Sequence, residues 1–314
     1  MSPTRQLGAN GPQVAAQGPG LMGLSMFYNT RLPDLPRLKF LCRWFKKTGK
    51  RKSIFLATKF GIQQHPGQPS SIHNEPEYVR RACLQSRARL GLAADDPIDF
   101  YYCHQIDLYQ PIEVTVQAMP TLVRDGLVRY LGFSEFSADT LLRADRVHPI
   151  VAVQIELSPF AVESLQNEFL AACQELGVSV IACSPLSRGF LTGKLNSPED
   201  FAESDRRRVL WRFSPENILK NLDIVRMLEP IASRKGCLAT QLTLGWLSAL
   251  DERIIPIPGT IKLENLEENL GSLDVQVTDE DIQTFNSVIE TAAVQGHRHP
   301  KVMMPSLYLV RWRT

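Results

Sequence analysis

Four polar residues, Lys59, His104, Ser134 and Gln154, stand at or near the ends of four successive apolar runs, and their types could support chemistry. Such runs predict buried parallel strands. An ammonium group at the end of a buried strand is costly unless it snorkels to solvent or serves a function. Because the carboxyl ends of barrel strands converge, we expect the four residues to lie together. A lysine and a histidine facing one site suit stabilisation or protonation of a developing alkoxide.

A second group of residues is suited to binding an anion. Gly259 and Thr260 leave the last predicted strand and lead into a helix that begins near Lys262. Backbone N–H groups at a helix start, a hydroxyl and an ammonium group predict a phosphate site. Thr260 is also suited to an ordinary N-cap, and the two roles are compatible. The loop 184–193 (SPLSRGFLTG), with Arg188 and two glycines, could cover a pyrophosphate.

The elements that must position these residues alternate regularly. Residues 5–11 and 13–24 predict a short hairpin followed by a glycine-rich strand over 18–24, and a short amphipathic helix follows at 38–47. The later predicted elements are strand 54–59, helix 76–90, strand 98–103, helix 111–125, strand 130–134, helix 137–146, strand 151–155, a helix with one apolar face over 165–176, strand 178–183, helix 215–235 (interrupted by Pro230), helix 238–250, strand 254–257, and helices 262–270 and 278–293.

Strand–helix repetition of this kind predicts an α/β fold of the (β/α)8 TIM-barrel type in one domain over residues 1–314. The count gives seven strands, one short of a closed barrel, so we expect the barrel to be incomplete. No G-x-G-x-x-G follows a strand, so a Rossmann domain is not expected.

Composition narrows the functional classes. Hydrophobic residues make up 44% of the chain and charged residues 22%, as in soluble globular proteins. The net charge of +2 gives no indication of a nucleic-acid or membrane partner. The six cysteines show no paired spacing and the N-terminus has no apolar leader, so a cytoplasmic protein with reduced thiols is expected. The histidines show no metal-ligand spacing, so no metal site is expected.

Several segments together resemble the aldo-keto reductase superfamily. They are 5–8 (RQLG), 56–61 (LATKFG), 99–104 (DFYYCH), 132–135 (GFSE), the loop 184–193, and 255–260 (IPIPGT) with 265–269 (NLEEN). The resemblance covers nearly the whole chain and is greatest to the branch with pyridoxal-reductase-like and fungal secondary-metabolism reductases. It implies a (β/α)8 barrel that reduces a small aldehyde or ketone with NADPH and without a metal.

By this resemblance, Lys59 and His104 match the catalytic lysine and histidine, and Ser134 and Gln154 match residues that hold the nicotinamide carboxamide. A cation at Lys262 favours NADP over NAD, because it can pair with a 2′-phosphate. The remaining residues that we expect to bind the cofactor are Gly23, Ser184, Leu186, Arg188, Gly259, Thr260, Asn265, Glu268 and Asn269.

The departures from the family pattern affect the predicted chemistry. The family's second strand ends in a motif resembling D-T-A-x-x-Y-G, which supplies an aspartate and a proton-donating tyrosine. No such motif occurs in this chain, and about one βα unit is absent between Tyr28 and Lys46. Cys183 stands where the family has an aromatic that stacks on the nicotinamide, and Pro120 falls inside a predicted helix.

Three hypotheses follow from the absent motif. The chain is a reductase whose sequence comes from a gene model or splice form lacking a segment, or it is an NADP-binding pseudoenzyme with a regulatory or interaction role. In the third hypothesis it is an active reductase that uses Tyr28 or His104 as a substitute acid.

Overall fold

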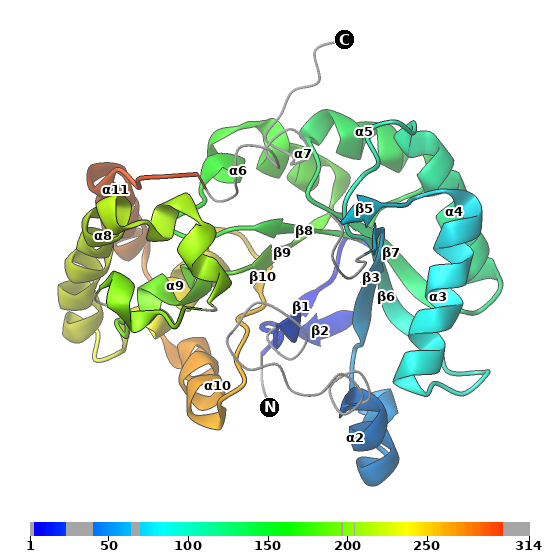
Figure 1. Ribbon diagram of the computed structural model, residues 1–314, viewed down its shortest axis with the longest axis horizontal. Helices are drawn as coiled ribbons and strands as arrows, with labels where there is room; N and C mark the ends of the chain where they lie inside the picture. Colours follow the sequence, from blue (N-terminus) through cyan, green and yellow to red (C-terminus); the bar gives the residue numbers. More distant parts are fainter. Residues whose placement is uncertain (1–2, 23–39, 64–69, 196, 204, 298–314) are drawn as a thin grey trace.

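The computed structural model describes residues 3–22, 40–63, 70–195, 197–203 and 205–297 (Figure 1). Its centre is a curved sheet of six parallel strands in the spatial order β10-β9-β8-β7-β6-β3, so each strand lies beside its predecessor in the chain. The strands are β3 (Ala57–Phe60), β6 (Ile98–Cys103), β7 (Val128–Ser134), β8 (Ala152–Glu156), β9 (Ser179–Cys183) and β10 (Ile254–Pro256).

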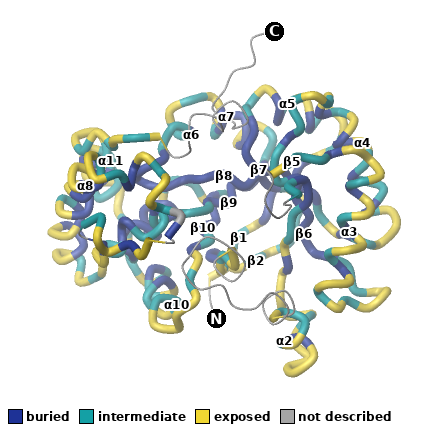
Figure 2. Tube along the Cα trace, viewed as in Figure 1, coloured by how far each residue is buried: buried dark blue, intermediate teal, exposed yellow. Residues whose placement is uncertain are grey.

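Helices follow the strands and cover the outer side of the sheet (Figure 1). Buried strands in the centre and exposed outer helix faces give the layered pattern in Figure 2. The helices are α2 (Phe40–Thr48), α3 (Pro76–Leu90), α4 (Ile112–Arg124), α5 (Ala138–Val147), α6 (Glu163–Gln166), α7 (Glu168–Leu176), α8 (Pro215–Arg234), α9 (Ala239–Leu250), α10 (Leu263–Leu270) and α11 (Asp279–Ala292).

The two faces of the sheet bury different side chains because successive residues of a strand point to opposite faces. The outer-face residues join the helices in one large core. The inner face has its own smaller core, which Leu7 joins from the turn between β1 (Thr4–Gln6) and β2 (Gln13–Ala15). A Cβ on Gly132 would lie 2.5 Å from the Phe100 ring, so glycine is required there. The other buried members of the inner core are Tyr102, Ala152, Ile181 and Ile255.

The glycine-rich segment predicted as a strand over 18–24 is shorter than expected. Over the described residues up to 22 it makes one parallel bridge, Gly20 to Gly259, and no longer strand. Gly20 N–H also donates to the Pro258 carbonyl at 3.0 Å, which places this segment beside β10. A Cβ on Gly20 would lie 2.7 Å from the Ile257 carbonyl oxygen, so the close approach depends on glycine.

The strand predicted over 54–59 begins later, at Ala57. Ile54 and Phe55, which the apolar pattern predicts to be buried, are each 38% exposed. Within the described ranges, β3 pairs only with β6, and its other edge has no strand partner there. Residues 23–39 lie outside the described residues. Most of the region where one βα unit is expected to be absent also falls in that range.

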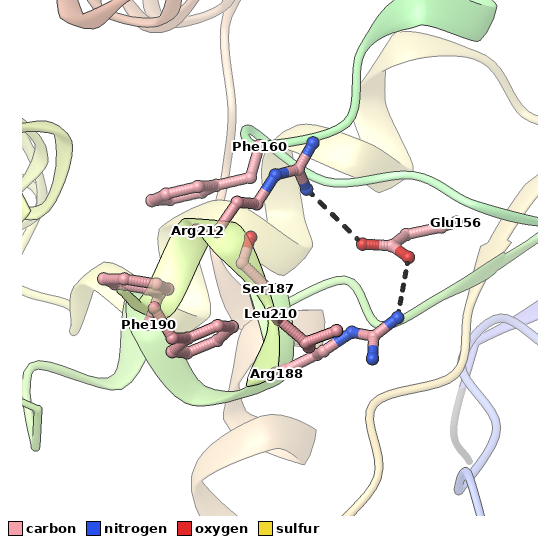
Figure 3. A pocket seen from close by; sticks show the side chains of 8 residues that line it. Glu156, Phe160, Ser187, Arg188, Phe190, Leu210 and Arg212 are labelled. Carbon is pink, nitrogen blue, oxygen red and sulfur yellow. Dashed lines mark hydrogen bonds and ion pairs between the residues drawn. The ribbon is translucent and has the colours of Figure 1, made fainter. Parts of the chain in front are cut away.

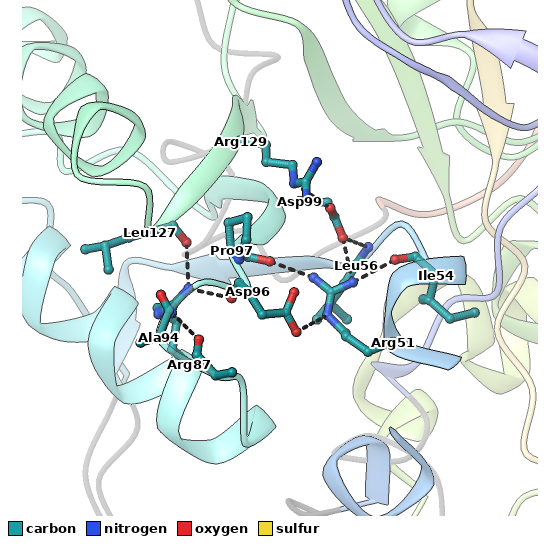
Figure 4. A network of polar contacts seen from close by, with 11 residues as sticks. Arg51, Ile54, Leu56, Arg87, Ala94, Asp96, Pro97, Asp99, Leu127 and Arg129 are labelled. Carbon is teal, nitrogen blue, oxygen red and sulfur yellow. Dashed lines mark hydrogen bonds and ion pairs between the residues drawn. The ribbon is translucent and has the colours of Figure 1, made fainter. Parts of the chain in front are cut away.

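A network of polar contacts anchors the start of β3 (Figure 4). The Arg51 guanidinium lies 2.9 Å from an Asp99 carboxylate oxygen and 3.4 Å from one of Asp96. It also donates to the Ile54 carbonyl at 2.8 Å. The Asp99 carboxylate accepts from the Leu56 N–H at 2.9 Å. These contacts tie the entry of β3 to the first residues of β6.

Two helices contain an interior proline and remain continuous. Pro120 lies inside α4, and Pro230 lies inside α8, where the interruption expected from the sequence is wrong. An interior proline costs about 3 kcal/mol or more in a helix. Met119 and Leu122 beside the first proline, and Leu228 and Ile231 beside the second, are buried, so tertiary packing outweighs this cost.

All six cysteines are free thiols. Among the described helices, none is long and apolar enough to cross a membrane.

Candidate active site

The strand register brings Lys59, His104, Ser134 and Gln154 together at the carboxyl ends of the strands. Lys59 is opposite Tyr102 in the pairing of β3 with β6, and Ser134 is opposite Gln154 in the pairing of β7 with β8. His104 follows Tyr102 by two residues and therefore points to the same inner face. All four stand at the carboxyl end of the sheet, as the sequence pattern predicts.

Lys59 is the lysine among these four residues, and its side chain is half-buried. Its ammonium nitrogen lies 5.4 Å from the centre of the Tyr102 ring, within range of a cation–π contact. Burial lowers the pKa of Lys59 below its ordinary value, and the nearby Cys183 opposes part of that shift. Within the described ranges, no carboxylate forms an ion pair with Lys59.

His104 is a neutral imidazole near pH 7. Burial lowers its pKa to about 3, and the positive charge of Lys59 contributes further in the same direction. A neutral imidazole can donate one hydrogen bond and accept another, but it lacks the acidic second N–H proton of an imidazolium ion. Lys59 is therefore the stronger acid of the two.

Tyr102 and Cys183 also lie near Lys59. Tyr102 is buried on the inner face, and burial raises the pKa of its phenol. Cys183 ends β9 and acts electrostatically on both Lys59 and Tyr102. Tyr102 was not predicted to be a site residue, although it stands two residues before His104 and shares its face.

Ser134 and Gln154 present polar groups at the adjoining strand ends, and both residues are buried. The Gln154 carbonyl accepts from the Glu135 N–H, while neither the Ser134 hydroxyl nor the Gln154 carboxamide bonds to another described residue. Both side chains therefore keep their hydrogen-bonding capacity for a ligand.

The loop 184–193 leaves β9 in a strained conformation. Ser184, Ser187 and Arg188 have φ angles of 50°, 51° and 57°, the left-handed region that non-glycine residues rarely adopt. A buried carboxylate from β8 holds the loop (Figure 3): Glu156 lies 3.3 Å from the Arg188 guanidinium. Glu156 also lies 3.7 Å from the guanidinium of Arg212, which is itself buried.

Aromatic rings pack beneath this loop. The Phe190 ring centre lies 5.0 Å from that of Phe160 and 4.5 Å from that of Phe213. The Ser187 hydroxyl donates to the Ser158 hydroxyl at 3.0 Å. The loop conformation is thus fixed by both ionic and apolar contacts.

The second predicted group of residues gathers at the start of α10. The Thr260 hydroxyl accepts from the Lys262 N–H at 3.1 Å, and the Lys262 side chain is exposed. Lys194, at the end of the loop, donates to Asn265 at 2.9 Å and lies 3.6 Å from the Glu268 carboxylate. Asn269 is also part of this region but is buried, and its carbonyl accepts from Gln17 at 3.0 Å.

A family model described as "Aldo/keto reductase family" matches residues 27–290. The chain belongs to the aldo/keto reductase family. It is therefore an oxidoreductase by family, and the resemblance inferred from its motifs is confirmed.

Two fungal relatives are similar over most of this aldo/keto reductase. Aldo-keto reductase str7 of Strobilurus tenacellus is 43% identical over 262 residues, which cover 83% of this chain and 76% of the relative. Aldo-keto reductase yakc (NADP(+)) of Schizosaccharomyces pombe is 40% identical over 326 residues, with 95% of this chain and 94% of the relative covered.

Solved structures are similar in fold. The glycerol dehydrogenase AKR11B4 of Gluconobacter oxydans has a TM-score of 0.76 at 20% identity, with 95% of this chain and 97% of that chain covered. The aldo-keto reductase AKR11C1 of Bacillus halodurans has a TM-score of 0.72 at 21% identity, with coverages of 96% and 100%. The predicted fold class, an α/β fold of the TIM-barrel type, is confirmed.

Two predicted site residues, Gly23 and Tyr28, lie outside the described residues. Glu156 and Lys194 contact predicted site residues but were missed, and so was Arg212, which lies beside Glu156. For Glu156 the signal was its position, two residues beyond Gln154 on the same strand face. Among the described residues, no group of His, Cys, Asp and Glu side chains could hold a metal ion.

Proposed function

We propose that this aldo/keto reductase binds NADP(H) along the carboxyl edge of its sheet and reduces an aldehyde or ketone to an alcohol. The observation that carries the proposal is the convergence of Lys59 and His104 beside Ser134 and Gln154, whose side chains bond to no other described residue. The fission yeast relative is named for NADP(+). Exposed Lys262 supports NADP over NAD, because an ammonium group can pair with a 2′-phosphate.

The described residues fit such a cofactor. Ser134 and Gln154 can hold a carboxamide, the strained loop 184–193 can lie over a pyrophosphate, and the start of α10 can take the adenosine end. NADPH supplies the hydride when it is bound. The substrate oxygen then needs a proton, and we assign that proton to the Lys59 ammonium. His104, a neutral imidazole, orients the carbonyl oxygen by a hydrogen bond.

A second candidate function is NADP binding with little or no turnover. Such a chain would have a regulatory or interaction role, or it would come from a gene model or splice form that lacks one βα unit. The open edge of β3 within the described ranges favours it. The alignment with the fission yeast relative also spans 326 residues, more than the 314 of this chain, so some positions of that relative have no counterpart here.

Titration of the purified chain with NADPH, followed by an assay of carbonyl reduction, tests both candidates. We expect saturable binding and measurable reduction, and Lys59→Met should lower kcat by about 10²–10⁴-fold, the usual contribution of a general acid. The rate should also fall as pH rises through the lowered pKa of Lys59, because the ammonium form is required.

The other outcomes separate the alternatives. Binding without reduction favours the second candidate, and reduction abolished by Tyr28→Phe makes Tyr28 the acid. No binding would overturn both functions. Sequencing transcripts across the codons for residues 28–46 identifies a gene-model or splice-form origin. The cytoplasmic location, the single domain over 1–314, the absence of a metal requirement and a role in secondary metabolism remain predictions from the sequence.

A further inference from the structure

The primary amine of Lys59 has surroundings that suit a different reaction of carbonyl compounds. We propose that Lys59 captures aldehydes covalently by forming an imine, an activity separate from hydride transfer. The inference depends on the position of Lys59 at the carboxyl edge of the sheet and not on the binding of NADP(H).

The first observation is that Lys59 combines partial burial with the lack of a carboxylate partner among the described residues. Two other lysines have such a partner. Lys235 lies 2.6 Å from the Asp281 carboxylate, and Lys194 lies 3.6 Å from that of Glu268. Lys59 has no such partner within the described ranges, although it is half-buried. An ammonium group that is removed from solvent and lacks a counter-ion gives up its proton more readily than a surface lysine.

The second observation is the set of titratable groups that face Lys59. They are Tyr102 of β6, His104 directly after β6, and Cys183 at the end of β9. Burial lowers the pKa of Lys59, with Cys183 opposing part of the shift. Each unit by which a pKa falls raises the fraction of free amine near neutral pH about tenfold. Desolvated lysines of this kind are the ones that proteins use as nucleophiles toward carbonyl groups.

The third observation is a group that can move the protons. In the addition step, the lone pair of the Lys59 nitrogen forms a C–N bond to the carbonyl carbon, and the C=O π electrons move to oxygen. His104, neutral at this pH, can accept a proton from the nitrogen and donate one to that oxygen. The C–O bond then breaks, water leaves, and a C=N bond remains. The balance is one aldehyde and one amine giving one imine and one water, so no oxidant or reductant is consumed.

Reductive trapping with benzaldehyde and sodium cyanoborohydride tests the proposal on the full chain without NADPH. Peptide mass spectrometry should locate the first benzyl group on Lys59, at a rate at least about tenfold above that of any surface lysine. Labelling at Lys59 should rise with pH through its lowered pKa, opposite to the pH dependence expected for carbonyl reduction.

Two variants sharpen the test. Lys59→Arg keeps a positive charge but has no amine that can form this imine, so fast labelling should disappear while the circular dichroism spectrum stays unchanged. Lys220→Met removes an exposed lysine on α8 and should leave labelling of Lys59 unaffected. If Lys59 reacts no faster than the surface lysines, or if fast labelling persists in Lys59→Arg, the inference is wrong.

The test also separates this inference from the proposed reductase function. A chain that is labelled rapidly at Lys59 but neither binds NADPH nor reduces carbonyls retains the inference and loses the proposed function. A chain that reduces carbonyls normally while Lys59 resists labelling retains the function and loses the inference.

Discussion

At the scale of single residues, Lys59 and His104 are coupled through charge. The positive charge of Lys59 disfavours a second positive charge on His104, whose pKa burial already lowers to about 3. Any positive charge that the pair carries near neutral pH therefore lies on Lys59 and not on His104, which is why we assign the donated proton to Lys59 and a hydrogen-bonding role to His104.

The lowered pKa of His104 predicts a loss of stability in acid. In the unfolded chain His104 has an ordinary pKa of 6.5. Below that pH, His104 is protonated in the unfolded state but stays neutral in the folded state. The free energy of unfolding should therefore fall as pH falls from 6.5 toward about 3. Urea unfolding at pH 7 and pH 4.5 (about 2 units below the ordinary value) should show a smaller loss for His104→Gln than for the wild type.

Carboxylates contribute equally to acid denaturation of the wild type and of His104→Gln. The difference between the two proteins in how the free energy of unfolding changes with pH therefore reports on His104. If the free energy of unfolding changes with pH in the same way in both proteins, the pKa of His104 in the folded state is close to its ordinary value of 6.5. Circular dichroism at pH 7 serves as the control for folding of the variant.

The site residues that could be predicted are those that combine polarity with a strand end. Lys59, His104, Ser134 and Gln154 follow apolar runs, and parallel strands bring such ends together. Tyr102 could not be singled out in this way, because a tyrosine inside an apolar run is equally suited to the core. The partners of Glu156 could not be predicted either, since Arg212 lies far from it in the sequence and meets it only through the fold.

At the scale of elements, the loop 184–193 depends on Glu156. Each non-glycine residue in the left-handed region costs of order 1–3 kcal/mol and persists only where surrounding contacts hold it. Ser184, Ser187 and Arg188 are three such residues. Since Glu156 engages the Arg188 guanidinium, we expect the loop to present its backbone N–H groups to a pyrophosphate, with the arginine side chain acting as an anchor.

Glu156→Gln should therefore weaken NADPH binding, by about tenfold or about 1.4 kcal/mol. The matched control is Glu163→Gln, because Glu163 is more exposed and lies 4.0 Å from the same Arg212. Fluorescence titration gives the dissociation constants, and a thermal melt shows whether each variant is folded. Tighter binding by Glu156→Gln would indicate instead that the carboxylate competes with phosphate for Arg188.

At this scale, the end of an element could be predicted where a neighbouring residue marks it. Helix α3 spans 76–90 as expected because Pro76 begins it and Gly91, in the left-handed region, ends it. The start of β3 was placed three residues too early, because an apolar run does not reveal whether a neighbouring strand covers it. The continuity of α8 through Pro230 was missed for a similar reason, since burial of its neighbours is a property of the whole fold.

At the scale of the whole molecule, the first and last strands in the sheet order, β10 and β3, are held by different contacts. The segment around Gly20 lies along β10 through the bridge to Gly259. At the other end, β3 has one strand partner within the described ranges and half-exposed apolar residues before it. Unpaired strand edges are sites of aggregation unless they are covered or held in place. The Arg51 network is the described structure that fixes the entry of this terminal strand.

We therefore expect Arg51→Met to destabilise the protein strongly. It removes a cation from two largely buried carboxylates, Asp99 and Asp96, and loss of one member of a buried ion pair costs about 3–5 kcal/mol. The matched control is Arg129→Met, because Arg129 lies 3.2 Å from the same Asp99 but is 58% exposed. That loss should be at most about 1 kcal/mol.

Urea unfolding measures both free energies, and native-state hydrogen exchange locates the change. In Arg51→Met the amides of β3 should exchange faster than those of β7 and β8, because the strand at the edge of the sheet loses its anchor while the central strands keep both neighbours. Equal effects of the two substitutions, or an exchange pattern that is uniform across the sheet, would show that β3 is held mainly by its pairing with β6. In that case the open edge would be stable without the network, and the burial of Arg51 would have no structural consequence for the barrel.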